Sequence, residues 1–502
     1  MNIKKAKDEI KNTVRAYLKK DADGEYIIPT IRQRPILLIG PPGVGKTQIM
    51  EQIAKECRIG LVSYTITHHT RQSAVGLPFI VEEEFGGKKY SVTEYTMSEI
   101  IASVYRKIEE GGRKEGILFI DEINCVSETL APTMLQFLQC KTFGNQAVPE
   151  GWIIAAAGNP PEYNKSVRDF DMVTLDRVRC MNIEADLGVW KEYAREKRLN
   201  SAILSYLELR PKNFYRVEAD VDGLQFVTAR GWEDLSNLMD VYEELGIPVD
   251  EEIIHEFLRH EDVAEDVSAY FDLYKKYQDD YGIAEILEGK VKPSVYARID
   301  QAAFDERLSV VNLLLDGVSN VFYQIQRERE ITDAWYDFLK EYRQKLKNSL
   351  QAKGIFETIL AEKTASDEQN EKQQFVSKAQ SDRARSLNEK LKECAKKIAA
   401  EETINIEETA LFALAKEPFD AQCEKLQSLE NQGIETLEHA FTFMEQAFSD
   451  GQEMVVFVTE LTITPEIAVF LSEHRIERYE TYKNQLLIGT KRAEILSEIA
   501  RD

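Results

Sequence analysis

The chain has 502 residues, 43% of them hydrophobic, and carries a formal net charge of −24 at pH 7. A chain of this length is expected to fold into about two to four domains with packed cores. Acidic residues outnumber basic ones, 87 to 63, which disfavours a nucleic-acid partner because phosphates are neutralised by concentrated Lys and Arg.

Targeting and redox signals indicate a cytoplasmic protein. We expect no membrane span, because no apolar run approaches the length that a bilayer requires. The N-terminal segment has mixed charge and lacks the continuous apolar core of a signal peptide. The six cysteines are dispersed and do not group with the histidines, so we expect reduced thiols and no zinc site.

An apolar strand at residues 36–39 runs directly into a glycine-rich loop of the pattern G-x-x-x-x-G-K-[ST]. The glycines let backbone N–H groups point at phosphates, and the helix that follows adds the positive end of its dipole. Lys46 would reach the terminal phosphates, and the Thr47 hydroxyl would ligate Mg²⁺. The sequence therefore predicts a site for magnesium with ATP or GTP. The predicted nucleotide contacts in this loop are Gly40, Pro41, Pro42, Gly43, Val44, Gly45, Lys46, Thr47 and Gln48.

Residues 79–95 interrupt the helical pattern with two β-prone runs around Gly86-Gly87. This arrangement predicts a hairpin.

A second buried strand is predicted at residues 117–120, and it is followed by Asp121 and Glu122. Ligands in open α/β sheets lie at the carboxyl ends of the strands, so Asp121 and Thr47 are expected to converge on one Mg²⁺ ion. Glu122 would polarise the attacking water.

A third strand at residues 152–157 leads to Asn159, whose amide could bond the γ-phosphate or the lytic water. An Asn before Pro is also a common turn residue. Farther along come Arg177 and, after a helical region, Arg230.

The order of these motifs resembles that of the AAA+ ATPases: a Walker A loop, a Walker B strand ending in Asp-Glu, an Asn after the third strand, and two later arginines. Within that superfamily the chain resembles the MoxR-type branch of the helix-2-insert clade. The segments that suggest the branch are TRQSAVGLP at 70–78, the insertion at 79–95, and PEGW at 149–152, which runs into AAGNP at 156–160. Nothing after residue 290 matches the resemblance.

The resemblance implies roles for single residues. Asn159 corresponds to sensor 1, and Arg230 resembles the sensor 2 arginine, which contacts the nucleotide of its own subunit. Arg177 resembles the arginine finger that reaches the γ-phosphate of a neighbouring subunit. Arg168 and Arg179 lie near the same position and are alternatives for that role. The catalytic set implied is Glu122, Asn159 and Arg177.

The predicted fold class is α/β, with a P-loop AAA+ core built on a parallel sheet, a helical lid and an additional, mostly α-helical C-terminal region. The apolar run 454–458 fits a strand or a buried helix, and its helical surroundings favour a helix. The predicted domains are an α/β core at 1–186, a helical lid at 187–285, a helical region at 286–362, a polar linker or exposed helix at 363–385, and a helical C-terminal module at 386–502.

MoxR-type ATPases act as hexameric chaperone-like machines, often with a partner that carries a von Willebrand A domain. The resemblance thus implies a homo-oligomeric, Mg-ATP-dependent ATPase that remodels or activates a protein client. Two alternatives stay open. One is a nucleic-acid-associated motor or GTP-using restriction-type subunit built on a related core. The other is a nucleotide-gated scaffold whose C-terminal helices dock a partner.

Overall fold

A computed structural model of the chain describes residues 1–68, 71–143, 146–163, 167, 170–220, 223–346, 352–373, 375–401 and 408–486. The chain forms two compact units. The first comprises Met1–Tyr193, Lys212–Leu238 and His255–Glu261. The second comprises Ala194–Pro211, Met239–Ile254 and Asp262–Asp502.

The first unit is built around a five-stranded sheet with the order β2-β5-β8-β1-β9, and every pairing in it is parallel. This arrangement confirms the α/β core with a parallel sheet. The central strands are buried, as continuous apolar runs in a parallel sheet require. The strands are β1 (Ile36–Ile39), β2 (Gly60–Thr65), β5 (Gly116–Asp121), β8 (Trp152–Gly158) and β9 (Arg179–Asn182).

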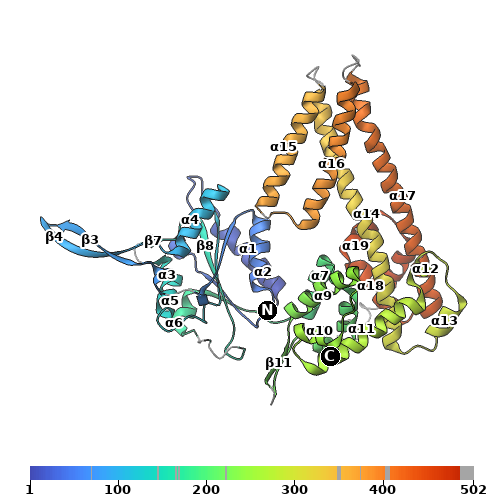
Figure 1. Ribbon diagram of the computed structural model, residues 1–502, viewed down its shortest axis with the longest axis horizontal. Helices are drawn as coiled ribbons and strands as arrows, with labels where there is room; N and C mark the ends of the chain where they lie inside the picture. Colours follow the sequence, from blue (N-terminus) through green and yellow to red (C-terminus); the bar gives the residue numbers. More distant parts are fainter. Residues whose placement is uncertain are drawn as a thin grey trace, which may run out of the picture. The chain divides into compact units, whose positions relative to one another are not determined.

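Helices cover both faces of this sheet (Figure 1). Alternate residues of β1 enter opposite cores, because side chains alternate across a strand. Leu38 packs in the core that includes residues of α1 and α2, and Leu37 packs in the core that includes residues of α4 and α5. The helices of this unit are α1 (Ile3–Tyr17), α2 (Lys46–Cys57), α3 (Arg71–Val75), α4 (Glu99–Gly111), α5 (Ala131–Cys140) and α6 (Met172–Arg177), with 3-10 turns at Thr30–Arg32 and Ile66–His68.

Among the described residues, three antiparallel strand pairs lie outside the main sheet. The first pairs β3 (Pro78–Phe85) with β4 (Lys88–Tyr95), which confirms the predicted hairpin. Its two-residue turn has φ values of +60° at Gly86 and +81° at Gly87. Positive φ at both positions suits a tight hairpin turn and favours glycine. The other two pair β6 (Thr142–Phe143) with β7 (Gln146–Ala147) and β10 (Arg216–Asp220) with β11 (Gly223–Val227).

The second unit is helical, which confirms the mostly α-helical C-terminal region. The run 454–458 lies within a helix, as its surroundings predict. The chain passes between the units within several helices, among them α7 (Leu187–Lys197), α9 (Ala229–Leu245) and α10 (Glu251–Phe257). The remaining helices are α8 (Ser201–Leu209), α11 (Glu261–Tyr281), α12 (Ile283–Leu287), α13 (Pro293–Ile299), α14 (Phe304–Leu346), α15 (Ala352–Lys372), α16 (Lys378–Glu401), α17 (Glu408–Phe448), α18 (Gln452–Ile463) and α19 (Pro465–Glu473), with a 3-10 turn at Pro211–Asn213.

In the described part of the helical unit, two apolar cores stabilise the packing of the helices. The larger one joins α8, α11 to α14 and the C-terminal half of α17 with α18 and α19, and it contains Phe322, Phe441 and Phe457. The smaller one contains Trp335, Phe356 and Leu391. It holds together α15, α16, the C-terminal half of α14 and the N-terminal half of α17, which we call the helical arm (Figure 1).

Among the described residues, α14 is long and apolar enough to cross a membrane. The bent pair α18–α19 is long and apolar enough only if the two helices are taken as one span. Within α14, 61% of the apolar 18-residue segment that could span a bilayer is buried inside the protein. Burial of this kind is what the central helix of a packed bundle shows.

Candidate functional site

The loop between β1 and α2 carries the predicted phosphate site. Gly45 caps α2 in the left-handed conformation with φ +88°, and Gly43 has φ +75°. A Cβ atom on Gly43 would lie 3.1 Å from the Thr228 side chain, and one on Gly40 would lie 2.8 Å from Ile183. Glycine is thus required for backbone conformation at Gly43 and Gly45, and for close packing at Gly40.

Lys46 lies at the centre of the site. Lys46 is only 8% exposed. Its Nζ donates to the carbonyl oxygens of Gly40 and Pro41, each at 2.8 Å, and to Oδ1 of Asn159 at 2.9 Å. These bonds bring the loop and the tip of β8 together, because the carboxyl ends of parallel strands lie at one edge of the sheet.

Burial lowers the pKa of Lys46 to about 8, and the negative charge of Asp121 opposes this effect. The positive charge of Arg230 lowers the pKa of Lys46 further, and the negative charge of Glu122 raises it. A buried ammonium group is poorly solvated, so phosphate oxygens beside it would stabilise its charged form.

Thr47 and Asp121 meet at the carboxyl end of β5. Thr47 Oγ1 donates to Asp121 Oδ2 at 2.7 Å. A hydroxyl and one carboxylate suit Mg²⁺, which takes few protein ligands and completes its shell with phosphate oxygens and water. Among the residues that the structure describes, no group of three or more His, Cys, Asp or Glu could hold a metal ion. The Thr47 hydroxyl and the Asp121 carboxylate fit a magnesium ion that binds together with a nucleotide.

Glu122 follows Asp121 in a strained backbone conformation, with φ +57°. A non-glycine residue in this region costs about 1–3 kcal/mol, and such strain gathers at functional sites. Its backbone N–H donates to Asp121 Oδ1 at 2.9 Å, and its Oε2 accepts from Thr67 Oγ1 at 3.1 Å. Sequence reasoning did not identify Thr67, because nothing in its local pattern marks a residue that contacts the end of a different strand.

Asn159 is fixed from both sides. Its side-chain oxygen accepts from Lys46, and its backbone carbonyl accepts from Asn124 Nδ2 at 2.8 Å. A Cβ on Gly158 would lie 2.5 Å from Asn124 Oδ1, so glycine is needed for this close approach. Asn124 was not predicted as a site residue. Its position in the turn after β5 is the signal that could have identified it.

Polar contacts also link α2 to α7 and the start of α9, and the loop to Tyr215 just before β10. Gln48 Nε2 donates to Tyr193 Oη at 2.9 Å, and that hydroxyl donates to Glu233 at 2.7 Å. The Tyr215 hydroxyl donates to the Pro42 carbonyl at 2.8 Å, and burial raises the pKa of that hydroxyl. Sequence reasoning did not identify Tyr193, Tyr215 or Glu233.

Arg230 is exposed in the first turn of α9, and Thr228 accepts the backbone N–H of Gly231 at 3.2 Å there. The charge of Arg230 influences the pKa of Lys46. Arg230 thus lies at the start of a helix beside the phosphate loop, where a Cβ on Gly43 would lie 3.4 Å from the Arg230 Cβ.

The three arginines that are candidates for the arginine finger differ in exposure and in contacts. Arg177 is exposed at the end of α6, where it donates to Gln139. Arg179 is half-buried on β9 and pairs with Glu9 of α1 at 2.5 Å. Arg168 lies outside the described residues.

Residues 36–174 match the family model described as the ATPase family associated with various cellular activities (AAA). The match spans β1 to α6, so it includes Lys46, Asp121 and Asn159 and ends before Arg177 and Arg230. It supports an ATPase of the AAA+ class and does not distinguish the MoxR-type branch. No curated protein matches the chain.

Proposed function

We propose that this AAA+ ATPase domain hydrolyses ATP with magnesium and that the chain uses this reaction to remodel or activate a protein client. The convergence of Lys46, Thr47, Asp121 and Asn159 at one edge of the sheet carries the proposal. Lys46 would hold the terminal phosphates, and Thr47 and Asp121 would hold the metal ion. Bound magnesium would neutralise charge on the phosphates.

Glu122 is the proposed group that orients and polarises the attacking water. Its carboxylate is anchored by Thr67 on one side, and its backbone is anchored to Asp121 on the other. Asn159 would position the γ-phosphate or the water, since its amide is held beside Lys46. Positioning and electrostatic stabilisation of this kind supply most of the catalysis in phosphoryl transfer.

We further propose that the active form is a homo-oligomeric ring, in which Arg177 completes the site of a neighbouring subunit. The exposure of Arg177 supports this assignment. The same helix exposes Met172 (83%), Val173 (52%) and Leu175 (39%), an apolar surface that a second subunit would cover. Arg179 is less suited to the role, because it is paired with Glu9 of its own chain.

Client contact is assigned to the β3–β4 hairpin. It exposes five large apolar side chains that would bind unfolded or loosely packed segments: Phe79 (41%), Ile80 (75%), Phe85 (56%), Tyr90 (50%) and Tyr95 (36%). The proposed hexameric ring, MoxR-type chaperone activity and partnership with a von Willebrand A domain protein come from the sequence resemblance. The proposed cytoplasmic location comes from the targeting and redox signals of the sequence.

Mixed-subunit kinetics test the proposal. Arg177→Ala and Glu122→Gln should each be nearly inactive alone, because an arginine finger contributes about 10³–10⁵ to the rate in other phosphoryl-transfer enzymes. Mixing the two variants should restore ATP turnover. In the productive interface, the intact Glu122 of an Arg177→Ala subunit meets the intact Arg177 of a Glu122→Gln subunit.

Arg179→Ala is the matched control. It should retain most of its activity alone, since Arg179 is bound within its own chain. No recovery of turnover in the Arg177→Ala mixture would rule out action between subunits. If Arg179→Ala is the inactive variant and is rescued by Glu122→Gln, the finger is Arg179.

A further inference from the structure

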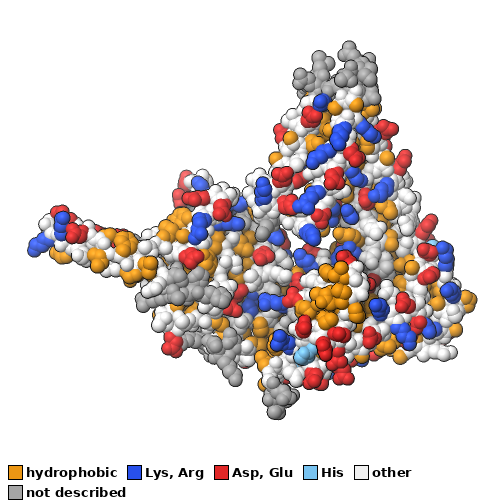
Figure 2. Space-filling model, viewed as in Figure 1, with side chains coloured by type: hydrophobic (Ala, Val, Ile, Leu, Met, Phe, Trp, Pro, Cys, Tyr) orange, Lys and Arg blue, Asp and Glu red, His pale blue; other side chains and the backbone are white. Residues whose placement is uncertain are grey.

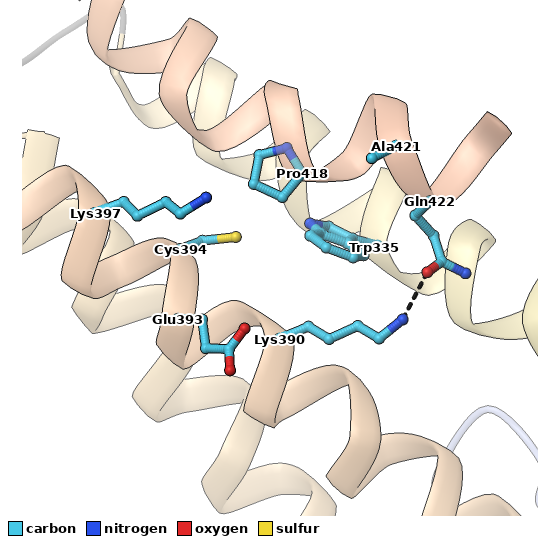
Figure 3. A pocket seen from close by; sticks show the side chains of 8 residues that line it. All are labelled: Trp335, Lys390, Glu393, Cys394, Lys397, Pro418, Ala421 and Gln422. Atoms are coloured by element: carbon cyan, nitrogen blue, oxygen red, sulfur yellow. Dashed lines mark hydrogen bonds between the residues drawn. The ribbon is translucent and has the colours of Figure 1, made fainter. Parts of the chain in front are cut away.

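The helical arm contains a pocket of about 240 Å³ that is separate from the nucleotide site (Figure 3). Three helices form it. α14 contributes Trp335, α17 contributes Pro418, Ala421 and Gln422, and α16 contributes Lys390, Glu393, Cys394 and Lys397. The walls are thus aromatic and small apolar side chains, and the rim is polar.

Trp335 provides the apolar floor and an unused hydrogen-bond donor. The residue is 2% exposed, and its Nε1 has no hydrogen-bond partner among the residues that the structure describes. In Figure 3 the nitrogen edge of the indole faces Cys394, and Lys397 extends toward the same space. A buried N–H without an acceptor carries a desolvation penalty, so an oxygen placed here would be stabilised.

Two lysines place positive charge at the pocket. Lys390 Nζ lies 5.9 Å from the centre of the Trp335 ring and donates to Gln422 Oε1 at 2.6 Å. Lys397 lies seven positions farther along α16, which is about 10 Å along a helix axis. Glu393 lies between them and is the one carboxylate among the lining residues.

The surrounding helix is basic, whereas the whole chain is acidic. α16 carries seven Lys and Arg against four Asp and Glu, although the net charge of the chain is −24. Figure 2 shows Lys and Arg side chains on the arm, interspersed with Asp and Glu. The nearby Glu328 is already paired with Lys425 at 2.8 Å and accepts from Gln422 at 2.7 Å. Within the arm, α16 therefore carries the excess of positive charge with which an acidic ligand could pair.

The volume limits what can enter the pocket. Pockets that enclose a drug-sized ligand measure about 300–1,000 Å³, so this smaller and open one suits a single side chain. A Tyr side chain combines an aromatic ring for Trp335 and Pro418 with an oxygen that can accept a hydrogen bond.

We propose that this pocket binds an acidic segment of a partner protein, with a tyrosine inserted as the anchor and flanking carboxylates paired with Lys390 and Lys397. The inference deepens the proposed function, because it names the chemistry of the partner, and it rests on that function for its biological role. Binding to the arm is measured without ATP hydrolysis, so the two proposals can fail separately.

Fluorescence anisotropy of a labelled peptide tests the site with the full chain. The probe is Glu-Asp-Tyr-Asp-Glu, and the comparison peptide has Ala in place of Tyr. We expect saturable binding of the first peptide and binding at least about tenfold weaker for the second, as for the loss of an interface anchor. Ala421→Phe should fill the pocket and abolish binding, and its side chain starts from an exposed position.

Charge reversal on α16 provides a matched pair. Lys397→Glu should weaken binding about tenfold or more. Lys392→Glu makes the same change on an exposed residue of the same helix that does not line the pocket, and it should have a much smaller effect. Trp335→Phe keeps an aromatic floor and removes the N–H donor, so it should weaken the Tyr peptide more than the Ala peptide.

Three results would overturn the proposal. They are the absence of saturable binding at millimolar peptide, equal losses in Lys392→Glu and Lys397→Glu, and displacement of the peptide by a single-stranded DNA oligonucleotide whose own binding depends on Lys397. Circular dichroism and ATP turnover of each variant show whether it is folded. Intact peptide binding without ATP turnover would contradict the proposed function and leave this site standing.

Discussion

The phosphate loop and the helical arm differ in how their sites arise from the sequence. In the loop, the residue types are dictated by the backbone: Gly43 and Gly45 have positive φ, and the buried Lys46 donates to its own loop. In the arm, the sequence specifies helices, but the pocket arises where Trp335, Lys390 and Pro418 meet from three different helices. The phosphate loop can thus be predicted from a local motif, whereas the pocket in the arm forms only when the three helices pack together.

The largest expected effect separates the two regions directly. Lys46→Ala should abolish nucleotide binding and turnover, because it removes the compact cation that faces the terminal phosphates. It should leave peptide binding to the arm unchanged. Isothermal titration with ATP and anisotropy with the acidic peptide measure the two effects on one preparation. ATP affinity near that of the wild type would contradict the assignment of the loop.

Glu122→Gln should separate binding from chemistry within the first region. The amide fills the same space but cannot polarise water as a carboxylate does, so turnover should fall by about 10²–10⁴ while ATP still binds. Single-turnover hydrolysis and equilibrium binding give the two quantities. Glu122→Asp is the companion variant, because it keeps the charge and shifts its position. Normal turnover in Glu122→Gln would remove Glu122 from its proposed role.

Phe441→Ala should lower the stability of the helical unit. Phe441 is fully buried in the larger helical core, with its ring 5.4 Å from that of Phe457. Removing it should destabilise the helical unit by about 3–5 kcal/mol. Denaturant unfolding followed by circular dichroism measures this loss, and Phe441→Leu should cost less because it keeps most of the volume. An equal loss in both variants would show that ring volume is not what Phe441 contributes.

The smallest expected effect is a proton taken up on ATP binding. Since burial lowers the pKa of Lys46 to about 8, the amine is largely neutral above that pH. Phosphate oxygens would raise its pKa again, so at pH 8.5 each ATP should bring about half a proton or more onto the protein. Apparent affinity should then fall as the pH rises from 8 toward 10.

Calorimetry in buffers of different ionisation enthalpy measures this uptake. Lys141 is the control, because burial also lowers its pKa to about 8 and it donates to the Thr30 carbonyl away from the phosphate loop. Proton uptake should persist in Lys141→Gln. Uptake that disappears in this variant would assign the proton to Lys141.

Several features of the first unit follow from local sequence. The continuous apolar run before Asp121 predicts a strand buried on both faces, and β5 is buried as expected. The repeated β-prone runs around Gly86 and Gly87 predict the hairpin that β3 and β4 form. These predictions depend on backbone preferences and burial patterns that neighbouring residues already encode.

Other features depend on residues far apart in the chain. Thr67 contacts Glu122 across 55 positions, and Tyr215 contacts Pro42 across 173. Neither pairing leaves a periodic signal, because each depends on which strands and helices become neighbours. The different settings of Arg177 and Arg179 were likewise not evident from their near-adjacent places in sequence.

The sequence by itself therefore determined the phosphate loop, its carboxylates and the helical character of the C-terminal half. In these cases the chemistry is local: a loop that binds phosphate needs glycine and lysine at set positions, and a helix needs apolar residues at its own period. Only the tertiary structure shows that Thr67 donates a hydrogen bond to Glu122, and that Trp335, Lys390 and Pro418 line one pocket in the arm. Those contacts exist only after the elements have packed, because burial and hydrogen bonding between distant segments select their partners in space.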